Sequence, residues 1–213
     1  MYKKSLLLFV GVVVCAMGTS FVIKGAIGAS AWDALSQSIS GVTSLKIGTV
    51  SMIINISCVV AQLIIVRPKS LITYILQIAI AVIFGSVLNF FLYQVLGQIE
   101  VTNLVVRTIA VVMGTIIAAF AVSFVMSLDF VGFPLESLCK VLSKNSKLGF
   151  GRIRQLADVI SMAIVLIITF ALGNELTLGV GTIIGVVLFG PLIDLFTSSI
   201  HPKIHKALSI QIN

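Results

Sequence analysis

Two carboxylates, Asp33 and Glu136, occupy matching places in the two halves of this sequence, 103 residues apart. Each follows a break in a long apolar run, with Trp32 beside the first and Phe133 shortly before the second. A charged group inside a membrane costs about 2.5 to 3.5 kcal/mol on insertion scales, so such carboxylates are typical of sites that bind a cation, a proton or a polar solute. The alternative is that both only stabilise a helix N-terminus, where the helix dipole favours negative charge.

A second pair of polar residues keeps the same separation. Asn55 falls on Asp158, and both lie within apolar runs. Arg154 precedes Asp158 by one helical turn, so an ion pair explains this aspartate as well as binding does. Hydrogen bonding between helices explains Asn55 equally well. We predict a substrate or ion site formed by Asp33, Glu136, Trp32, Asn55 and Asp158.

Three secondary candidates have stronger structural alternatives. Asn89 and Asp194 match at a separation of 105, but Asp194 follows Pro191 near the end of the last apolar run, where helix capping is the expected role. Thr182 ends the run Gly-Val-Gly-Thr, which lacks the preceding strand and the lysine of a nucleotide-binding loop. Close helix packing is the better explanation of those glycines.

Apolar helices must position these residues. Of the 213 residues, 59% are hydrophobic and only 10% are charged, whereas soluble domains carry about 25% charged residues. The chain is therefore predicted to be an all-α polytopic membrane protein, a single membrane domain over residues 1–213. Six runs approach the roughly 20 residues that a spanning helix needs, and they lie at 5–23, 49–66, 71–96, 105–128, 153–173 and 177–199.

The net charge of +7 fits membrane orientation better than nucleic-acid binding, because aromatic residues are few and no basic helix stands out. If the N-terminus is cytoplasmic, the outer segments hold only Lys24, Lys46 and Arg107, and the remaining Lys and Arg residues lie inside. We expect a multi-pass protein of the cell membrane with both termini in the cytoplasm. We expect no nucleic-acid partner.

The two halves, 5–96 and 105–199, are predicted to be repeats. Several residues recur at the constant separation, namely Ser20, Ser40, Leu45 and Gly48 as Ser123, Ser143, Leu148 and Gly151. Three spans per half is an odd number, so the second half would enter the membrane from the opposite side and form an inverted three-helix repeat. Each half would add a short broken or interfacial helix, a pattern typical of secondary transporters. We expect both short helices to point their N-termini inward, with Ser30 as a cap and Pro134 in a first turn.

Several short motifs resemble the YczE/YyaS/YitT family of bacterial membrane proteins. They are Gly25-Ala-Ile-Gly28, Trp32-Asp33-Ala-Leu-Ser36, Gly48, Asn55, Leu178-Gly-Val-Gly-Thr182 and Gly190-Pro-Leu-Ile-Asp194. The resemblance covers nearly the whole chain. Because little sequence follows the last span, the chain resembles the shorter YczE/YyaS type, whereas YitT carries a soluble C-terminal domain. The resemblance implies the architecture and leaves the substrate open.

The sequence shows no Ser-His-Asp or Cys-His set, no metal-ligand cluster and no kinase or hydrolase motif, so we expect no enzyme, no cofactor and no metal. The expected function is secondary transport of a small polar solute or ion. Two alternatives stay open: a membrane interaction or regulatory protein that binds a partner through the basic segment 140–154, and a binding subunit of a larger uptake complex. The expected partners are the lipid bilayer and the unknown solute, and a homo-oligomer is compatible with the sequence.

Overall fold

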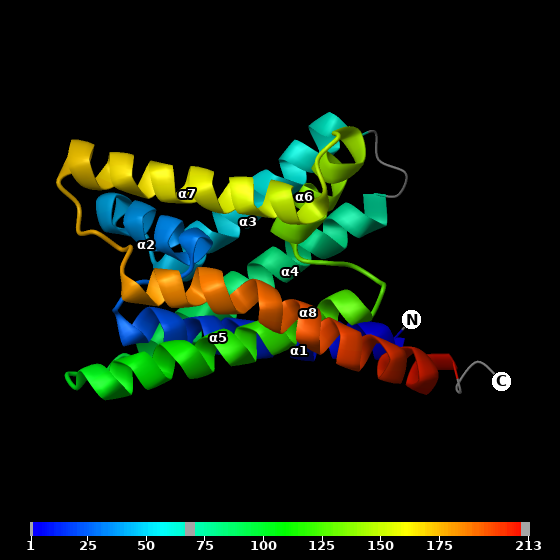
Figure 1. The fold of residues 1–213 in the computed structure, drawn as a ribbon, viewed down its shortest axis with the longest axis horizontal. Coiled ribbons are helices and arrows are strands. Elements are labelled where there is room, and N and C mark those ends of the chain that lie inside the picture. Colours follow the sequence, from blue (N-terminus) through cyan, green and yellow to red (C-terminus); the bar gives the residue numbers. More distant parts are fainter. Residues whose placement is uncertain (1, 67–70, 210–213) are drawn as a thin grey trace.

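The computed structural model describes residues 2–66 and 71–209, and every regular element in these ranges is helical (Figure 1). Six helices are long and apolar enough to cross a membrane. They are α1 (Tyr2–Gly25), α3 (Ile47–Ile65), α4 (Leu71–Phe90), α5 (Leu104–Ser127), α7 (Phe150–Leu172) and α8 (Val180–Ser209). Two short helices, α2 (Ala31–Thr43) and α6 (Pro134–Asn145), interrupt the series, and the π-helical turn η1 (Phe91–Val95) extends α4. The predicted all-helical class with six long apolar helices is confirmed.

The last helix runs further than the sequence predicts. The expected span ended at residue 199, but α8 continues through Pro191 and Pro202 to Ser209. Proline inside a helix removes one backbone hydrogen bond and usually bends or ends it, yet apolar helices tolerate it where other groups satisfy the freed carbonyl. Close to Pro191, the carbonyl of Ile193 also accepts a hydrogen bond of 3.1 Å from the hydroxyl of Ser123 on α5, which joins this stretch of α8 to α5.

The helices pack in a bundle in which the start of α1 and the end of α8 lie at the same end (Figure 1). α1 packs along α5, α5 along α8, and α4 contacts both α1 and α3. The short helix α2 packs against α3 and α7, and α6 packs against the same two helices. The short helices therefore lie inside the bundle, between long helices from both halves of the chain.

Glycines allow α1 and α5 to approach closely. A Cβ atom added to Gly18 would lie 2.7 Å from the backbone nitrogen of Ala118 and 2.9 Å from the carbonyl oxygen of Gly114. Such backbone contact is how helices associate in a membrane, where apolar lipid removes the hydrophobic drive that joins helices in water. This contact places the cavity-facing side chains of α1 and α5 next to one another.

Both short helices begin as the sequence predicts. The hydroxyl of Ser30 accepts a hydrogen bond from the backbone N–H of Asp33 at 3.3 Å and so caps α2. Pro134 occupies the first turn of α6, where its missing N–H has no intrahelical partner. A serine near the end of each short helix closes the following turn in the same way: Ser40 donates to the carbonyl of Leu45 at 2.5 Å, and Ser143 to that of Leu148 at 3.0 Å.

The break between α1 and α2 is held against the start of α8. Gly28 has a φ of 108°, which side chains other than glycine rarely adopt, and a Cβ there would lie 2.5 Å from the backbone nitrogen of Gly179. The N–H of Gly181 donates to the carbonyl of Ile27 at 2.8 Å. Close backbone packing therefore explains the Gly-Val-Gly run, in agreement with the expectation from the sequence.

Candidate functional site

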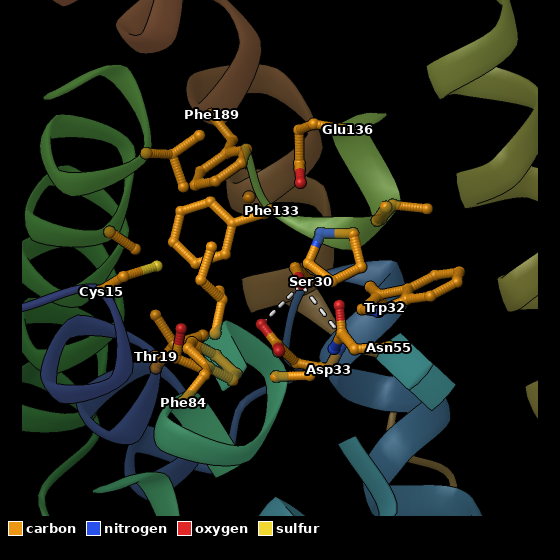
Figure 2. Close-up of a pocket in the computed structure, with 18 of the residues that line it drawn as sticks. Cys15, Thr19, Ser30, Trp32, Asp33, Asn55, Phe84, Phe133, Glu136 and Phe189 are labelled. Carbon is orange, nitrogen blue, oxygen red and sulfur yellow. Dashed lines mark hydrogen bonds between the residues drawn. The ribbon is translucent and has the colours of Figure 1, made fainter. Parts of the chain in front are cut away.

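The N-termini of α2 and α6 meet at one cavity inside the bundle (Figure 2). Trp32 and Asp33 line it from the first turn of α2, and Leu135 and Glu136 line it from the first turn of α6. The expectation that both short helices point their N-termini inward is confirmed. All eight α-helices contribute lining residues, and the cavity measures about 90 Å³. This space holds several water molecules or a solute of a few non-hydrogen atoms.

Asp33 lies at the cavity and is tied to the cap of its own helix. Its carboxylate accepts a hydrogen bond of 2.6 Å from the hydroxyl of Ser30, which also accepts from the Asp33 N–H. α2 lies outside the six long spans, and burial raises the pKa of Asp33 from 3.8 to about 6. The Ser30 hydrogen bond and the positive charge of Arg154 favour the ionised form and offset part of this rise, whereas Asp158 adds to it. Asp33 can therefore exchange a proton near neutral pH.

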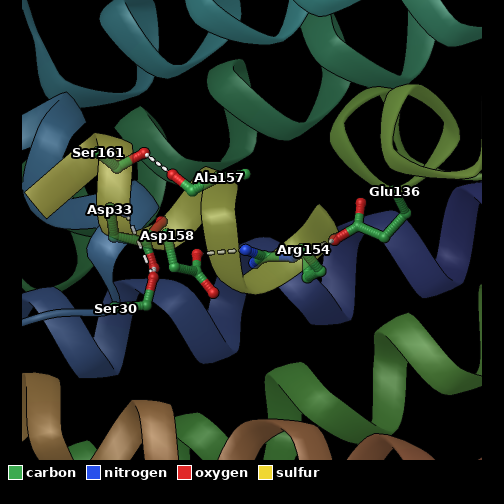
Figure 3. A network of polar contacts seen from close by, with 7 residues as sticks. All are labelled: Ser30, Asp33, Glu136, Arg154, Ala157, Asp158 and Ser161. Atoms are coloured by element: carbon green, nitrogen blue, oxygen red, sulfur yellow. Dashed lines mark hydrogen bonds and ion pairs between the residues drawn. The ribbon is translucent and has the colours of Figure 1, made fainter. Parts of the chain in front are cut away.

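Glu136, Arg154 and Asp158 form a chain of charges beside the cavity (Figure 3). The Nε atom of Arg154 lies 3.9 Å from Oε1 of Glu136, and its Nη1 atom forms an ion pair with Oδ1 of Asp158 one turn along α7. Glu136 and Arg154 line the cavity. Asp158 contacts it only through Arg154, so the ion-pair alternative explains its position.

Asn55 is buried, with 7% of its surface exposed, and lines the same cavity from α3 (Figure 2). Its Nδ2 atom donates to the carbonyl of Ser51 at 2.9 Å. Its Oδ1 atom accepts no hydrogen bond from any residue in the described ranges. A buried amide oxygen at a cavity without a donor is a feature that a bound solute would satisfy.

Aromatic rings form much of the apolar wall. Phe84 of α4 and Phe133, the residue before α6, meet edge to face with ring centroids 6.3 Å apart. Phe189 of α8 lines the cavity with them (Figure 2). The site therefore combines a few polar groups with carbon walls, as small-molecule sites in proteins do.

The three secondary candidates lie outside this cavity, and two of them, Asn89 and Thr182, have structural roles. Asn89 accepts a hydrogen bond of 2.8 Å from the N–H of Gly48 and donates to the hydroxyl of Thr49 at 3.1 Å, so it joins α4 to the start of α3. Thr182 accepts from the N–H of Gly179 at 3.1 Å and stabilises the start of α8. The capping role expected for Asp194 is wrong, because α8 continues past it and leaves its side chain exposed within the helix.

Several residues that line the cavity are not predicted by the sequence. Cys15, Thr19 and Thr115 face the cavity from α1 and α5, but their types and spacing resemble those of ordinary packing residues. Arg154 was recognised only as a partner of Asp158. One signal was present for the aromatic wall, because Phe84 and Phe189 are 105 residues apart, the separation that relates Asn89 to Asp194.

The fold and the cavity define a class: a helical protein with six membrane-length helices around a small cavity that has apolar walls and a few polar groups. Residues 2–198 match the family described as Family of unknown function (DUF6198), and because the match covers nearly the whole chain, the protein belongs to this family. It is also similar to a Bacillus subtilis (strain 168) protein described as Uncharacterized protein YyaS, with 25% identity over 187 residues, 88% of this chain and 89% of the relative. The resemblance to the YyaS type is thus confirmed. No solved structure matches the chain.

Proposed function

We propose that the protein is a secondary transporter that moves a small polar solute or ion through its central cavity. The observation that carries this proposal is the meeting of two short helices, from matching places in the two halves, at one cavity where each contributes a carboxylate. Broken helices in matching places that meet inside the bundle are the usual construction of a transporter site. Asp33 and Glu136 are the proposed solute-binding or ion-binding residues, with Asn55 and Arg154 beside them.

The composition of the cavity supports inverted repeats. Seven pairs of lining residues are related by the separations found in the sequence: 15 with 118, 19 with 122, 30 with 133, 32 with 135 and 33 with 136 at 103, and 80 with 185 and 84 with 189 at 105. The two halves thus contribute equivalent positions to one site. Such a site is expected on a pseudo-two-fold axis between repeats.

Contacts elsewhere repeat in the same way. Gly11 of α1 lies against Val125 of α5, and the equivalent Gly114 of α5 lies against Val22 of α1. The short helix of each half packs on the second long helix of the other half: α2 packs on α7, and α6 packs on α3. These reciprocal contacts support an arrangement in which the halves exchange conformations and open the cavity first to one side of the membrane and then to the other.

Transport is tested by removing both cavity carboxylates. The double variant Asp33→Asn with Glu136→Gln is compared with Glu100→Gln and Glu175→Gln together, a control that removes the same charge from two exposed positions. Uptake and export of a panel of small amines, amino acids, organic acids and inorganic ions are measured in a deletion strain and in liposomes. We expect wild type and control to move at least one solute that the cavity variant does not. Unchanged transport of every solute by the folded cavity variant would contradict the proposal.

A second function, binding of a partner protein, is supported by the basic surface of the segment 140–154. Lys140, Lys144, Lys147 and Arg152 are all exposed there. Anionic lipid is the competing occupant, since cations beside membrane helices attract negatively charged headgroups. A stoichiometric partner that co-purifies in detergent with wild type, and is lost when these four residues are changed to glutamine, would favour the interaction function.

A further inference from the structure

We infer that the cavity takes a small ammonium cation, a primary amine of a few non-hydrogen atoms that donates hydrogen bonds to Asp33 and Asn55. This inference rests on the proposed transport function and narrows its solute class. It stands on three features of the cavity: the hydrogen-bonding groups left free, the balance of charge, and the character of the walls.

Two of the three hydroxyl groups that line the cavity already donate within the protein. The hydroxyl of Ser30 donates to the carboxylate of Asp33 at 2.6 Å, and the hydroxyl of Thr115 donates to a backbone carbonyl one turn earlier at 2.7 Å. The guanidinium of Arg154 is paired with carboxylates on α6 and α7. Thr19 carries the remaining lining hydroxyl among the described residues, and a hydroxyl can either donate or accept.

Acceptors, by contrast, stay free. Oδ1 of Asn55 has no donor among the described residues, although the side chain is more than nine-tenths buried and lines the cavity. Asp33 uses one carboxylate oxygen for Ser30, and its other oxygen has room for a further donor. The indole N–H of Trp32 is also unpartnered, but neighbouring atoms cover it completely, so it offers the cavity nothing. These free acceptors favour a solute that donates hydrogen bonds.

The charge balance calls for one positive charge. Three carboxylates, those of Asp33, Glu136 and Asp158, surround the single guanidinium of Arg154, which is the one basic residue lining the cavity among the described ranges. Each of the two helix N-termini contributes about half a positive charge. The sum is close to one negative charge, and because Arg154 is shared by Glu136 and Asp158, the uncompensated charge lies at Asp33.

The walls suit an organic cation. Phe84, Phe133 and Phe189 present rings to the cavity, and ring faces attract alkylammonium groups. The few oxygen atoms present fall short of the shell that a bare metal ion prefers, since hard cations take six or more oxygen ligands. A cavity of about 90 Å³ limits the solute to a short alkyl chain. An anion would have to face two carboxylates.

The test is equilibrium binding of ethylammonium chloride to the purified protein in detergent, followed by thermal unfolding. Sodium acetate, of similar size and opposite charge, and sodium chloride are measured at matched ionic strength. A ligand that binds only the folded state raises Tm with the logarithm of its concentration above Kd. We expect this rise with ethylammonium in wild type and in Glu100→Gln, little rise with either sodium salt, and loss of at least tenfold in affinity in Asp33→Asn and Asn55→Leu.

The other outcomes overturn the inference in distinguishable ways. A larger rise with acetate would identify an anion site, an equal rise with the two chloride salts but not with acetate would identify a chloride site, and an equal rise with both sodium salts would identify a metal-ion site; each would overturn the inference and leave the transport proposal standing. The salts are tested up to about 100 mM. This concentration is well above a Kd of 1 mM, which corresponds to a binding free energy of only about 4 kcal/mol. No rise in Tm with any salt would therefore exclude a small ammonium ligand. The transport proposal is judged separately, by the solute panel with the cavity double variant.

Discussion

Glu136 of α6 lies 3.9 Å from the Nε atom of Arg154 on α7, and this contact joins the short helix of the second half to the next long helix at the edge of the cavity. The two side chains are largely buried, with 12% and 20% of their surfaces exposed. Because Arg154 also pairs with Asp158, one cation holds two carboxylates that would otherwise repel each other. The position of Glu136 at the cavity therefore depends on Arg154.

Replacing Arg154 tests this dependence. Arg154→Met leaves Glu136 and Asp158 without their counter-ion, and we expect the free energy of unfolding in detergent to fall by about 2 to 3 kcal/mol, below the 3 to 5 typical of fully buried pairs because these side chains keep some exposure. Arg152→Met on the exposed face of the same helix is the control and should change little. Adding Glu136→Gln to Arg154→Met should restore part of the loss. Equal effects at 152 and 154 would contradict the structural role.

Gly18 is predicted to be essential for the packing of α1 on α5. Gly18→Ala places a methyl group 2.7 Å from a backbone atom of α5, which cannot move aside as a side chain can. We expect a loss of about 1 to 3 kcal/mol in the free energy of unfolding, the usual cost of overpacking. Gly190→Ala on α8 is the matched control, because nothing lies within 4 Å of the added methyl. It should be neutral or stabilising, and equal loss in both variants would refute the close contact.

The raised pKa of Asp33 predicts a pH-dependent stability difference. The carboxyl has a pKa of about 6 in the folded protein against 3.8 ordinarily, so its contribution to stability is fully present below pH 3.8 and is lost as the pH rises through 6. Asp33→Asn does not titrate. The Tm of this variant minus that of wild type should therefore rise between pH 3.8 and about 6 and level off at higher pH. Asp33→Glu, which keeps an ionisable group, should follow wild type, and a difference independent of pH would show that burial does not raise this pKa.

Cysteine labelling tests the predicted orientation. In intact cells, single cysteines at Lys46 or Glu100 are expected to react with a membrane-impermeant maleimide, and a cysteine at Lys144 only after permeabilisation, because Lys and Arg residues favour the cytoplasmic side. The native Cys15, Cys58 and Cys139 are buried and are replaced by serine for this purpose. A second predicted inner position, Lys69, lies outside the described residues. Labelling of Lys144 from outside would remove the argument for inverted halves.

The sequence by itself determined the all-helical class, the six long apolar helices and the two breaks between them. Hydropathy decides these features because a helix in lipid satisfies its own backbone hydrogen bonds, so a run of about 20 apolar residues becomes a span whatever surrounds it. The sequence also determined where the short helices begin, because the interactions at their starts involve residues within one turn. Ser30 caps α2, and Pro134 occupies the first turn of α6. The recurrence at a constant separation paired Asp33 with Glu136 before any contact was known.

Tertiary structure alone decided which polar residues share the cavity. Asn55 and Asp158 occupy matching positions in the sequence, yet only Asn55 lines the cavity. Asp158 instead forms an ion pair with Arg154 on its own helix. Asn89 has the same residue type as Asn55 but joins two helix ends. The rotation of each helix about its axis selects the face that meets the cavity, and that rotation is set by contacts between distant segments, such as those of Gly18 with α5 and of Gly28 with Gly179. Hydropathy carries little information on such contacts, because almost every face of these helices is apolar.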